Sequence, residues 1–211
     1  EVTYNVLVNP ANYHDKEELE RIKNYKEEIK KDEIIYPIIF ENIIQQADDK
    51  WVGTIPAKLF AQLLQNNKLN YNFETQREPV YVKHKDGVIK QPNINPESVA
   101  EMTKLMIEGL YNYDDITFNI LANGEEIIEY DEKTNLFKIV AGQLDLIDGA
   151  HRGKAIESAL LVNPDITENF TLVLTNYDVD KANNYIVQKD KRNPLNAEFK
   201  EAKDTTNLSN D

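Results

Sequence analysis

Short apolar runs alternate with amphipathic helical patterns through the middle of the chain, and this alternation restricts the fold more than any other feature. The runs are bounded by turn sequences such as Asn123-Gly124, and they predict strands. Strands are expected at 116–121, 126–130, 136–140, 144–147 and 170–175. Helices are expected at 96–108, 151–162 and 178–189. The sequence therefore predicts an α/β fold of the α+β kind, in which helices pack on a small mixed sheet.

The first part of the chain carries weaker patterns. It predicts a strand at 2–8, a charged surface helix at 15–31, an edge or bent strand at 34–40 around Pro37, and a helix at 55–66. Thr54 is expected to cap this last helix, Pro56 to lie in its first turn, and Trp51 to lie in the connection before it. A final helix is expected at 196–202.

These patterns suggest three parts. Residues 1–52 are expected to form an N-terminal extension packed on a core domain at 53–203, and 204–211 a flexible tail. The chain begins at Glu1 rather than Met, which suggests a domain of a longer protein or one whose start has been processed.

Composition excludes several classes of protein. The chain holds 24 Lys and Arg against 37 Asp and Glu, which gives a formal charge of −13, and it has no cysteine. It therefore has no disulfide, no thiolate nucleophile and no cysteine-bound zinc, and oxygen ligands would have to hold any metal ion. A charge of −13 disfavours a protein that coats nucleic acid through its general field. No run is long enough to span a membrane, and we expect a cytoplasmic protein.

One segment carries a recognisable chemical pattern. An apolar strand runs into Asp148-Gly149, and the helix that follows bears His151 and Arg152 in its first turn. Free N–H groups at a helix start attract anions, a guanidinium adds two parallel hydrogen bonds, and an imidazole adds another donor. The pattern thus predicts a phosphate-binding turn. The alternative is a turn without a ligand, in which Asp148 caps the helix and pairs with Arg152.

Residues 148–152 read DGAHR and are followed by Ala155-Ile156. This segment resembles the DGQHR motif of the family that contains the DndB-like regulators of DNA phosphorothioation, within the ParB/sulfiredoxin-like superfamily. Gln76-Arg77 is similar to a strip that these proteins carry before the core, and 182–188 with Asn193-Pro194-Leu195 to a helix and turn after it. The resemblance spans roughly residues 70–203. It implies a ParB/sulfiredoxin-like fold and a role in a bacterial or phage DNA-transaction or regulatory protein.

The departures from the family pattern concern position 150. ParB-like domains carry a glutamate there and sulfiredoxins a catalytic cysteine, whereas this chain has Ala150. Alanine can neither attack nor bind a metal ion, so sulfiredoxin chemistry is excluded. The residues that contact phosphates are retained as Gly149, His151 and Arg152. The resemblance therefore implies a module that binds DNA or a nucleotide without turnover, and the sequence leaves open duplex, single strand or free nucleotide.

Two further clusters could extend such a site. If Arg77 folds against the motif, its guanidinium would bind an anion together with Arg152, and Gln76 could read a base edge or a sugar. The densest basic cluster contains Lys189, Lys191 and Arg192, and it could follow a nucleic-acid backbone. The alternative for Arg77 is an exposed hairpin residue that pairs with a neighbouring glutamate. The alternative for the basic cluster is a solvated helix end.

Two other functions remain open. The first is a Mg²⁺-dependent nuclease or nucleotide hydrolase that acts on DNA or a nucleoside triphosphate. Asp148 and Asp145, expected on one strand face, would hold the metal, and His151 would transfer a proton or stabilise charge. The second is a protein-interaction domain with a relic motif, which presents the acidic helix 15–31 to a partner. The sequence predicts no oligomeric state.

Overall fold

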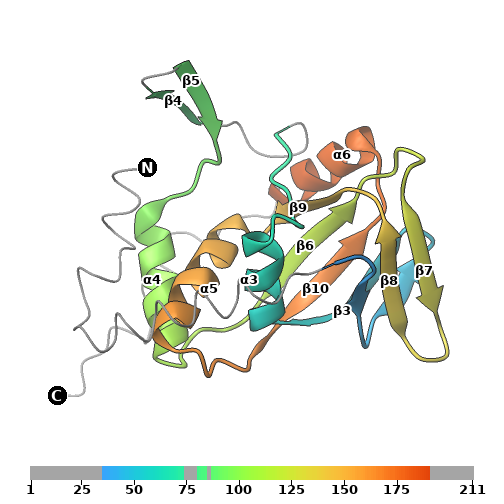
Figure 1. Cartoon of the computed structure of the whole chain (residues 1–211), viewed down its shortest axis with the longest axis horizontal. Coiled ribbons are helices and arrows are strands. Elements are labelled where there is room, and N and C mark those ends of the chain that lie inside the picture. The colour runs from blue at the N-terminus through green and yellow to red at the C-terminus, as the bar shows by residue number, and fades with distance from the viewer. Residues whose placement is uncertain (1–34, 74–79, 85–86, 191–211) are drawn as a thin grey trace.

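The computed structural model describes residues 35–73, 80–84 and 87–190, as Figure 1 shows. The strand expected at 2–8, the helices expected at 15–31 and 196–202, and the expected tail lie outside the described residues. In the described part the chain is a mixed α/β structure. No helix in these ranges is long and apolar enough to cross a membrane.

A five-stranded mixed sheet forms the centre of the molecule. Its strands, in spatial order, are β2 (Ile44–Ala47), β3 (Lys50–Pro56), β10 (Asn169–Thr175), β6 (Asp115–Ile120) and β9 (Leu144–Asp148). β10 and β6 run parallel, and the other neighbours are antiparallel. β6 is buried from Ile116 onward because it is flanked by strands and covered on both faces.

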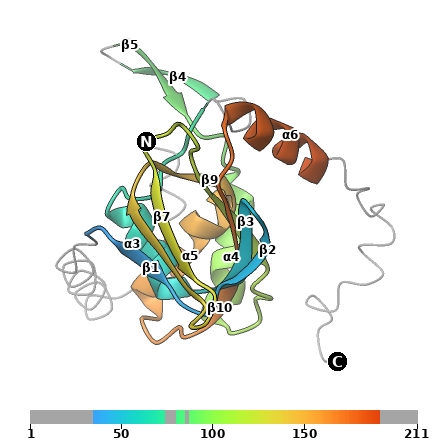
Figure 2. The same cartoon turned by 90° about the vertical axis from the view of Figure 1, so that its right-hand side faces the viewer.

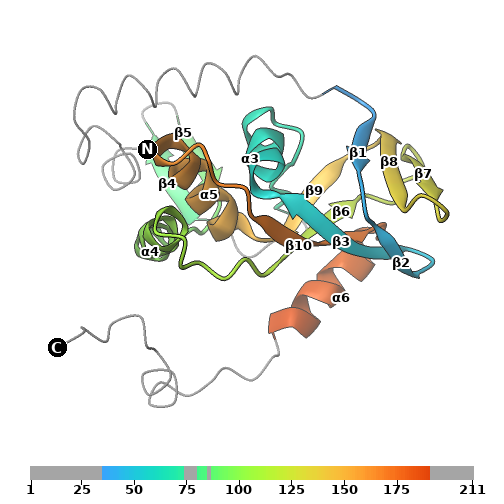
Figure 3. The same cartoon turned by 90° about the horizontal axis from the view of Figure 1, so that it is seen from below.

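Helices cover both faces of this sheet, as Figure 3 shows from below. On one face lie α3 (Ala57–Gln65) and α5 (Ala150–Val162), with α4 (Pro96–Ile107) packed on α5, and on the other lies α6 (Val179–Asp190). Under α3 the core is aromatic: the Phe60 ring lies 5.6 Å from the Phe118 ring and 5.5 Å from the Phe170 ring. Under α6 a smaller apolar cluster contains Ile147, Tyr177 and Ala182.

Two smaller sheets complete the described chain. β1 (Ile38–Phe40), β8 (Leu136–Ala141) and β7 (Ile127–Asp131) form an antiparallel sheet in that order. Trp51 joins it to the central sheet, with its ring 4.9 Å from that of Phe137. β4 (Val80–His84) and β5 (Gly87–Gln91) form a hairpin that stands off the body in Figures 1 and 2.

Most elements with strong local signals match the predictions. α4 begins as expected, with the Asn95 side chain accepting hydrogen bonds from the N–H groups of Glu97 and Ser98 and with Pro96 in the first turn. α5, α6, β10 and the four strands between α4 and α5 lie within two residues of their expected bounds. The prediction of an edge strand near Pro37 is confirmed, because β1 follows it and pairs only with β8 among the described strands.

Several expectations were wrong. The four strands between α4 and α5 do not form one sheet: β6 and β9 belong to the central sheet, and β7 and β8 to the other. Trp51 lies inside β3 rather than in a connection, and Thr54 belongs to the same strand and caps nothing. Pro56 is the N-cap residue of α3, which begins at Ala57 because β3 pairs with β10 as far as Pro56. The expected boundary between residues 52 and 53 falls inside this strand.

Candidate functional site

The DGAHR turn lies where β9 ends and α5 begins, beside the start of β6. Antiparallel pairing places Asp148 opposite Thr117. Gly149 has a φ of +112°, and a Cβ added there would lie 2.8 Å from Cγ2 of Ile116, so the turn requires glycine. Gly149 is also the N-cap residue of α5 and supplies no side-chain acceptor to the first-turn N–H groups. The Asp148 cap, which the alternative without a ligand expected, is therefore not formed.

Arg152 lies against this turn in a double ion pair. Its Nη2 lies 3.0 Å from Oδ1 of Asp148, and its Nη1 lies 3.3 Å from Oδ2 of Asp114. The ion pair with Asp148 is the one that the alternative without a ligand expected. The Arg152 side chain is only 17% exposed, whereas that of Asp114 is 55% exposed. Among the described residues, its buried Nε has no hydrogen-bond partner. The arginine is therefore held near the start of α5 by one fixed and one exposed carboxylate.

Lys189 reaches the same turn from the last turn of α6. Its Nζ lies 2.8 Å from Oδ2 of Asp115, 2.9 Å from Oδ2 of Asp148 and 3.0 Å from Oγ1 of Thr117. The side chain is 13% exposed. In this structure the ammonium binds two carboxylates of its own chain, which corrects the expectation that it faces a nucleic-acid backbone.

The pKa shifts agree with this geometry. Burial alone would lower the pKa of Lys189, but the hydrogen bonds and charges of Asp115 and Asp148 outweigh it and raise the pKa. Burial alone would raise the pKa of Asp115, but its hydrogen bond and attraction to Lys189, with a contribution from Arg152, lower it. The three aspartates and two cations sum to 2 − 3 = −1. The turn is thus an ion-pair network with a small negative balance.

His151 binds the beginning of another helix. Its Nε2 accepts a hydrogen bond of 2.9 Å from the backbone N–H of Asn95, the N-cap residue of α4. A backbone N–H can only donate, so Nε2 carries no proton in this arrangement and is not the expected phosphate donor. The imidazole instead connects the start of α4 to the start of α5.

Asp145 is separate from Asp148. The sheet register sets Asp145 opposite Asn119 and Asp148 opposite Thr117, about 7 Å apart along β6. The Asp145 carboxylate is fully buried and accepts hydrogen bonds of 2.8 Å from the side-chain amides of Asn72 and Gln143. Burial raises the pKa of Asp145, and the two amides oppose this in part.

These carboxylates do not fit the expected Mg²⁺ site. The oxygens of Asp148 face the ammonium of Lys189 and the guanidinium of Arg152, and those of Asp145 face two amides. Within residues 35–73, 80–84 and 87–190, no group of three or more His, Asp or Glu side chains is arranged to hold a metal ion.

Four candidate residues are not described by the structure, and three residues that contact the site were not predicted. Gln76, Arg77, Lys191 and Arg192 lie outside the described residues. Sequence reasoning missed the pair Asp114-Asp115 and Thr117, which supply three of the site's contacts. Two acidic residues directly before an expected strand were the available signal, but nothing local indicates that this strand lies beside the motif.

The chain matches no protein-family model and no solved structure. It is 28% identical over 198 residues to the SPbeta prophage-derived uncharacterized protein YopQ of Bacillus subtilis (strain 168). This match covers 89% of the chain and 43% of the relative. The chain therefore spans less than half the length of that relative.

Proposed function

We propose that this chain is a phosphate-binding module that contacts DNA or a nucleotide at the start of α5, without turnover. In this proposal it has a ParB/sulfiredoxin-like fold and belongs to a cytoplasmic phage or bacterial protein of DNA transactions. One observation carries the proposal: Arg152 lies beside a helix start whose N-cap residue is glycine, and one of its two carboxylate partners is more than half exposed. The prophage origin of the similar protein supports the phage context.

The two carboxylates that hold Arg152 have different parts in this proposal. Asp114 is exposed and makes the longer contact, and exposed ion pairs contribute only about 0–1 kcal/mol. A phosphate group can replace it at the guanidinium, because it offers more acceptor oxygens and also interacts with the first-turn N–H groups and the helix dipole. Asp148 stays in place because Lys189 also binds it. The exchange leaves the network intact except at Asp114.

The same contacts support the proposed lack of turnover. Ala150 offers neither a nucleophile nor a metal ligand, and both oxygens of Asp148 are bound by cations. The negative balance of the turn also opposes loose binding of polyanions. Only a ligand whose phosphate reaches Arg152 gains the full interaction.

Binding of a short DNA duplex and of ATP at one fixed salt concentration tests the proposal. Arg152→Gln should weaken binding at least tenfold, and Asp114→Asn should tighten it several-fold because the competing carboxylate is gone. Glu129→Gln is the matched control for Asp114→Asn, since it also removes one negative charge from an exposed ion pair, here on β7. It should have little effect on binding. Unchanged affinity in Arg152→Gln would refute the proposal. Mg²⁺-dependent phosphate release or DNA cleavage that is lost in Asp148→Asn would favour the hydrolase alternative instead.

A further inference from the structure

The hairpin of β4 and β5 is a separate two-stranded sheet. Its register runs from Val80 opposite Gln91 to His84 opposite Gly87, and each strand packs chiefly against the other. Figures 1 and 2 show it projecting from the body, away from the sheets. A two-stranded hairpin without a packed face is at best marginally stable in water. A projection of this kind is therefore suited to binding a partner.

The charge of the hairpin differs from that of the rest of the chain. The described hairpin residues, 80–84 and 87–91, contain Lys83 and Lys90 and no acidic residue, which gives +2. The rest of the sequence carries 22 cations and 37 anions, which gives 22 − 37 = −15. The hairpin is thus a positively charged projection on a strongly acidic chain, and its charge is complementary to a polyanion.

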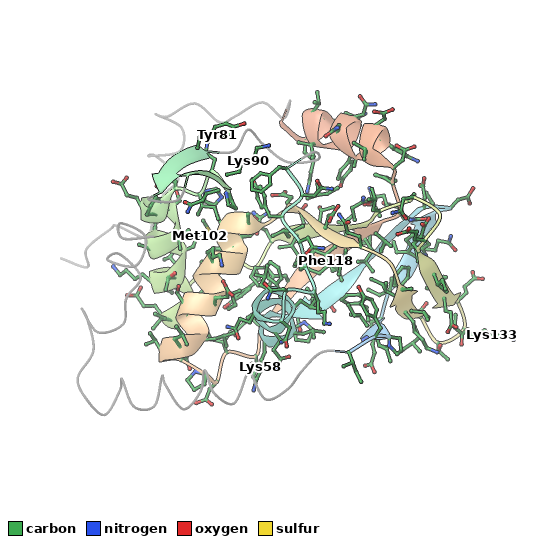
Figure 4. All side chains as sticks on the ribbon, turned by 45° about the horizontal axis from the view of Figure 1, so that its top comes forward. Lys58, Tyr81, Lys90, Met102, Phe118 and Lys133 are labelled. Carbon is green, nitrogen blue, oxygen red and sulfur yellow. The ribbon has the colours of Figure 1, made fainter. Side chains whose placement is uncertain are left out.

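The exposed side chains near the base of the hairpin suit a nucleic acid. Tyr81 is 62% exposed and pairs across the strands with Lys90, which is also exposed. Figure 4 labels both residues on the hairpin. An aromatic ring beside an ammonium group can contact a base or sugar while the cation contacts a phosphate.

The hairpin leaves the body beside the proposed phosphate site. β5 ends at Gln91, four residues before Asn95, whose N–H donates to His151 in the first turn of α5. Four residues span at most about 14 Å. One duplex could therefore contact the start of α5 and the hairpin together.

We propose that the β4–β5 hairpin is a DNA-binding arm that enters the major groove of a duplex while the start of α5 binds a backbone phosphate. This inference rests on the proposed function and names its ligand as double-stranded DNA. The major groove of B-form DNA, about 12 Å wide, admits a two-stranded β-ribbon. The major groove of A-form RNA is too narrow for side chains to read, so duplex RNA should bind less well.

Binding of a fluorescent 20-bp DNA duplex over a series of salt concentrations tests the arm. A double variant, Lys83→Ser with Lys90→Ser, should bind at least tenfold more weakly. The slope of log affinity against log salt should also fall by about 2, because two phosphate contacts are lost. The matched control replaces Lys104 and Lys133 with serine, since these two lysines are exposed and lie outside the hairpin. Figure 4 shows Lys133 at the opposite end of the molecule from Tyr81 and Lys90.

The outcomes separate the two proposals. Equal affinity and equal salt slope in the hairpin and control double variants would overturn the arm. If Arg152→Gln loses binding while the hairpin variant retains it, the arm is refuted and the α5 site stands. If the hairpin variant loses binding while Arg152→Gln retains it, the arm stands and the α5 site is refuted. If the wild-type chain does not bind the duplex, the arm is refuted as a DNA contact, and the partner of the hairpin would then be a protein. An unchanged melting temperature shows that each variant is folded.

Discussion

Lys189→Met tests how much the ion pairs of Lys189 contribute to the stability of the fold. The variant keeps most of the side-chain volume but removes the ammonium that binds Asp115 and Asp148. Each charge-assisted hydrogen bond contributes up to about 1.5–3 kcal/mol when shielded from water. The carboxylate side chains are 36% and 41% exposed, so solvent screening reduces this figure. We expect a loss of about 2 kcal/mol in the free energy of unfolding at pH 7.

Urea denaturation at two pH values measures this loss and its electrostatic origin. The pKa of Asp115 is lowered in the folded chain, so its contribution is present above its ordinary range and is lost as the pH falls through its folded value. The raised pKa of Lys189 adds a contribution that is lost only at strongly alkaline pH. Because the folded value lies below the ordinary 3.8, the difference between wild type and Lys189→Met should shrink between pH 7 and about pH 3.

Lys181→Met is the matched control on the same helix. Lys181 pairs with Asp49 but is more than half exposed, so its loss should lower the free energy of unfolding much less than the loss of Lys189. Equal losses for the two variants at pH 7, or a Lys189→Met loss that does not change with pH, would refute a structural role for the Lys189 ion pairs.

Two further predictions follow from the turn. Gly149→Ala should lower the free energy of unfolding, measured by urea denaturation, by about 3 kcal/mol, because the alanine would have a positive φ and would clash with Ile116. Gly124→Ala, with a positive φ but open space, should lower it by about 1 kcal/mol. Equal losses in the two variants would contradict the clash. His151→Phe should speed hydrogen exchange of the Asn95 amide and cost about 1 kcal/mol, because it removes the acceptor for that N–H; an unchanged exchange rate would show that this bond does not hold the start of α4.

Helices and strands with local sequence signals were predictable from the sequence. Which strands become neighbours in a sheet was not. Asn95 and Pro96 mark the start of α4 by capping chemistry that acts within one turn. The division of four similar strands between two sheets depends on distant contacts, such as the pairing of β3 with β10 and the contact of Trp51 with Phe137. Strand propensity carries no information about which strands become neighbours.

The same limit applies to the site. The ion pair between Asp148 and Arg152, which lie one helical turn apart, was expected only in the alternative of a turn without a ligand, and it is present. The sequence misplaced Lys189, because a lysine at a helix end has the same sequence signature whether its ammonium meets solvent or a carboxylate 41 residues away. It also missed the role of His151 as an acceptor, since Asn95 lies 56 residues away along the chain.

The most direct test of the central claim is a titration of the isotope-labelled chain with a short DNA duplex, followed through its backbone amide resonances. If the start of α5 binds phosphate, the amides of Ala150, His151 and Arg152 should shift in a saturable manner, and the shifts should be lost in Arg152→Gln. Saturable shifts confined to other parts of the chain, with these three amides unmoved, would contradict the claim.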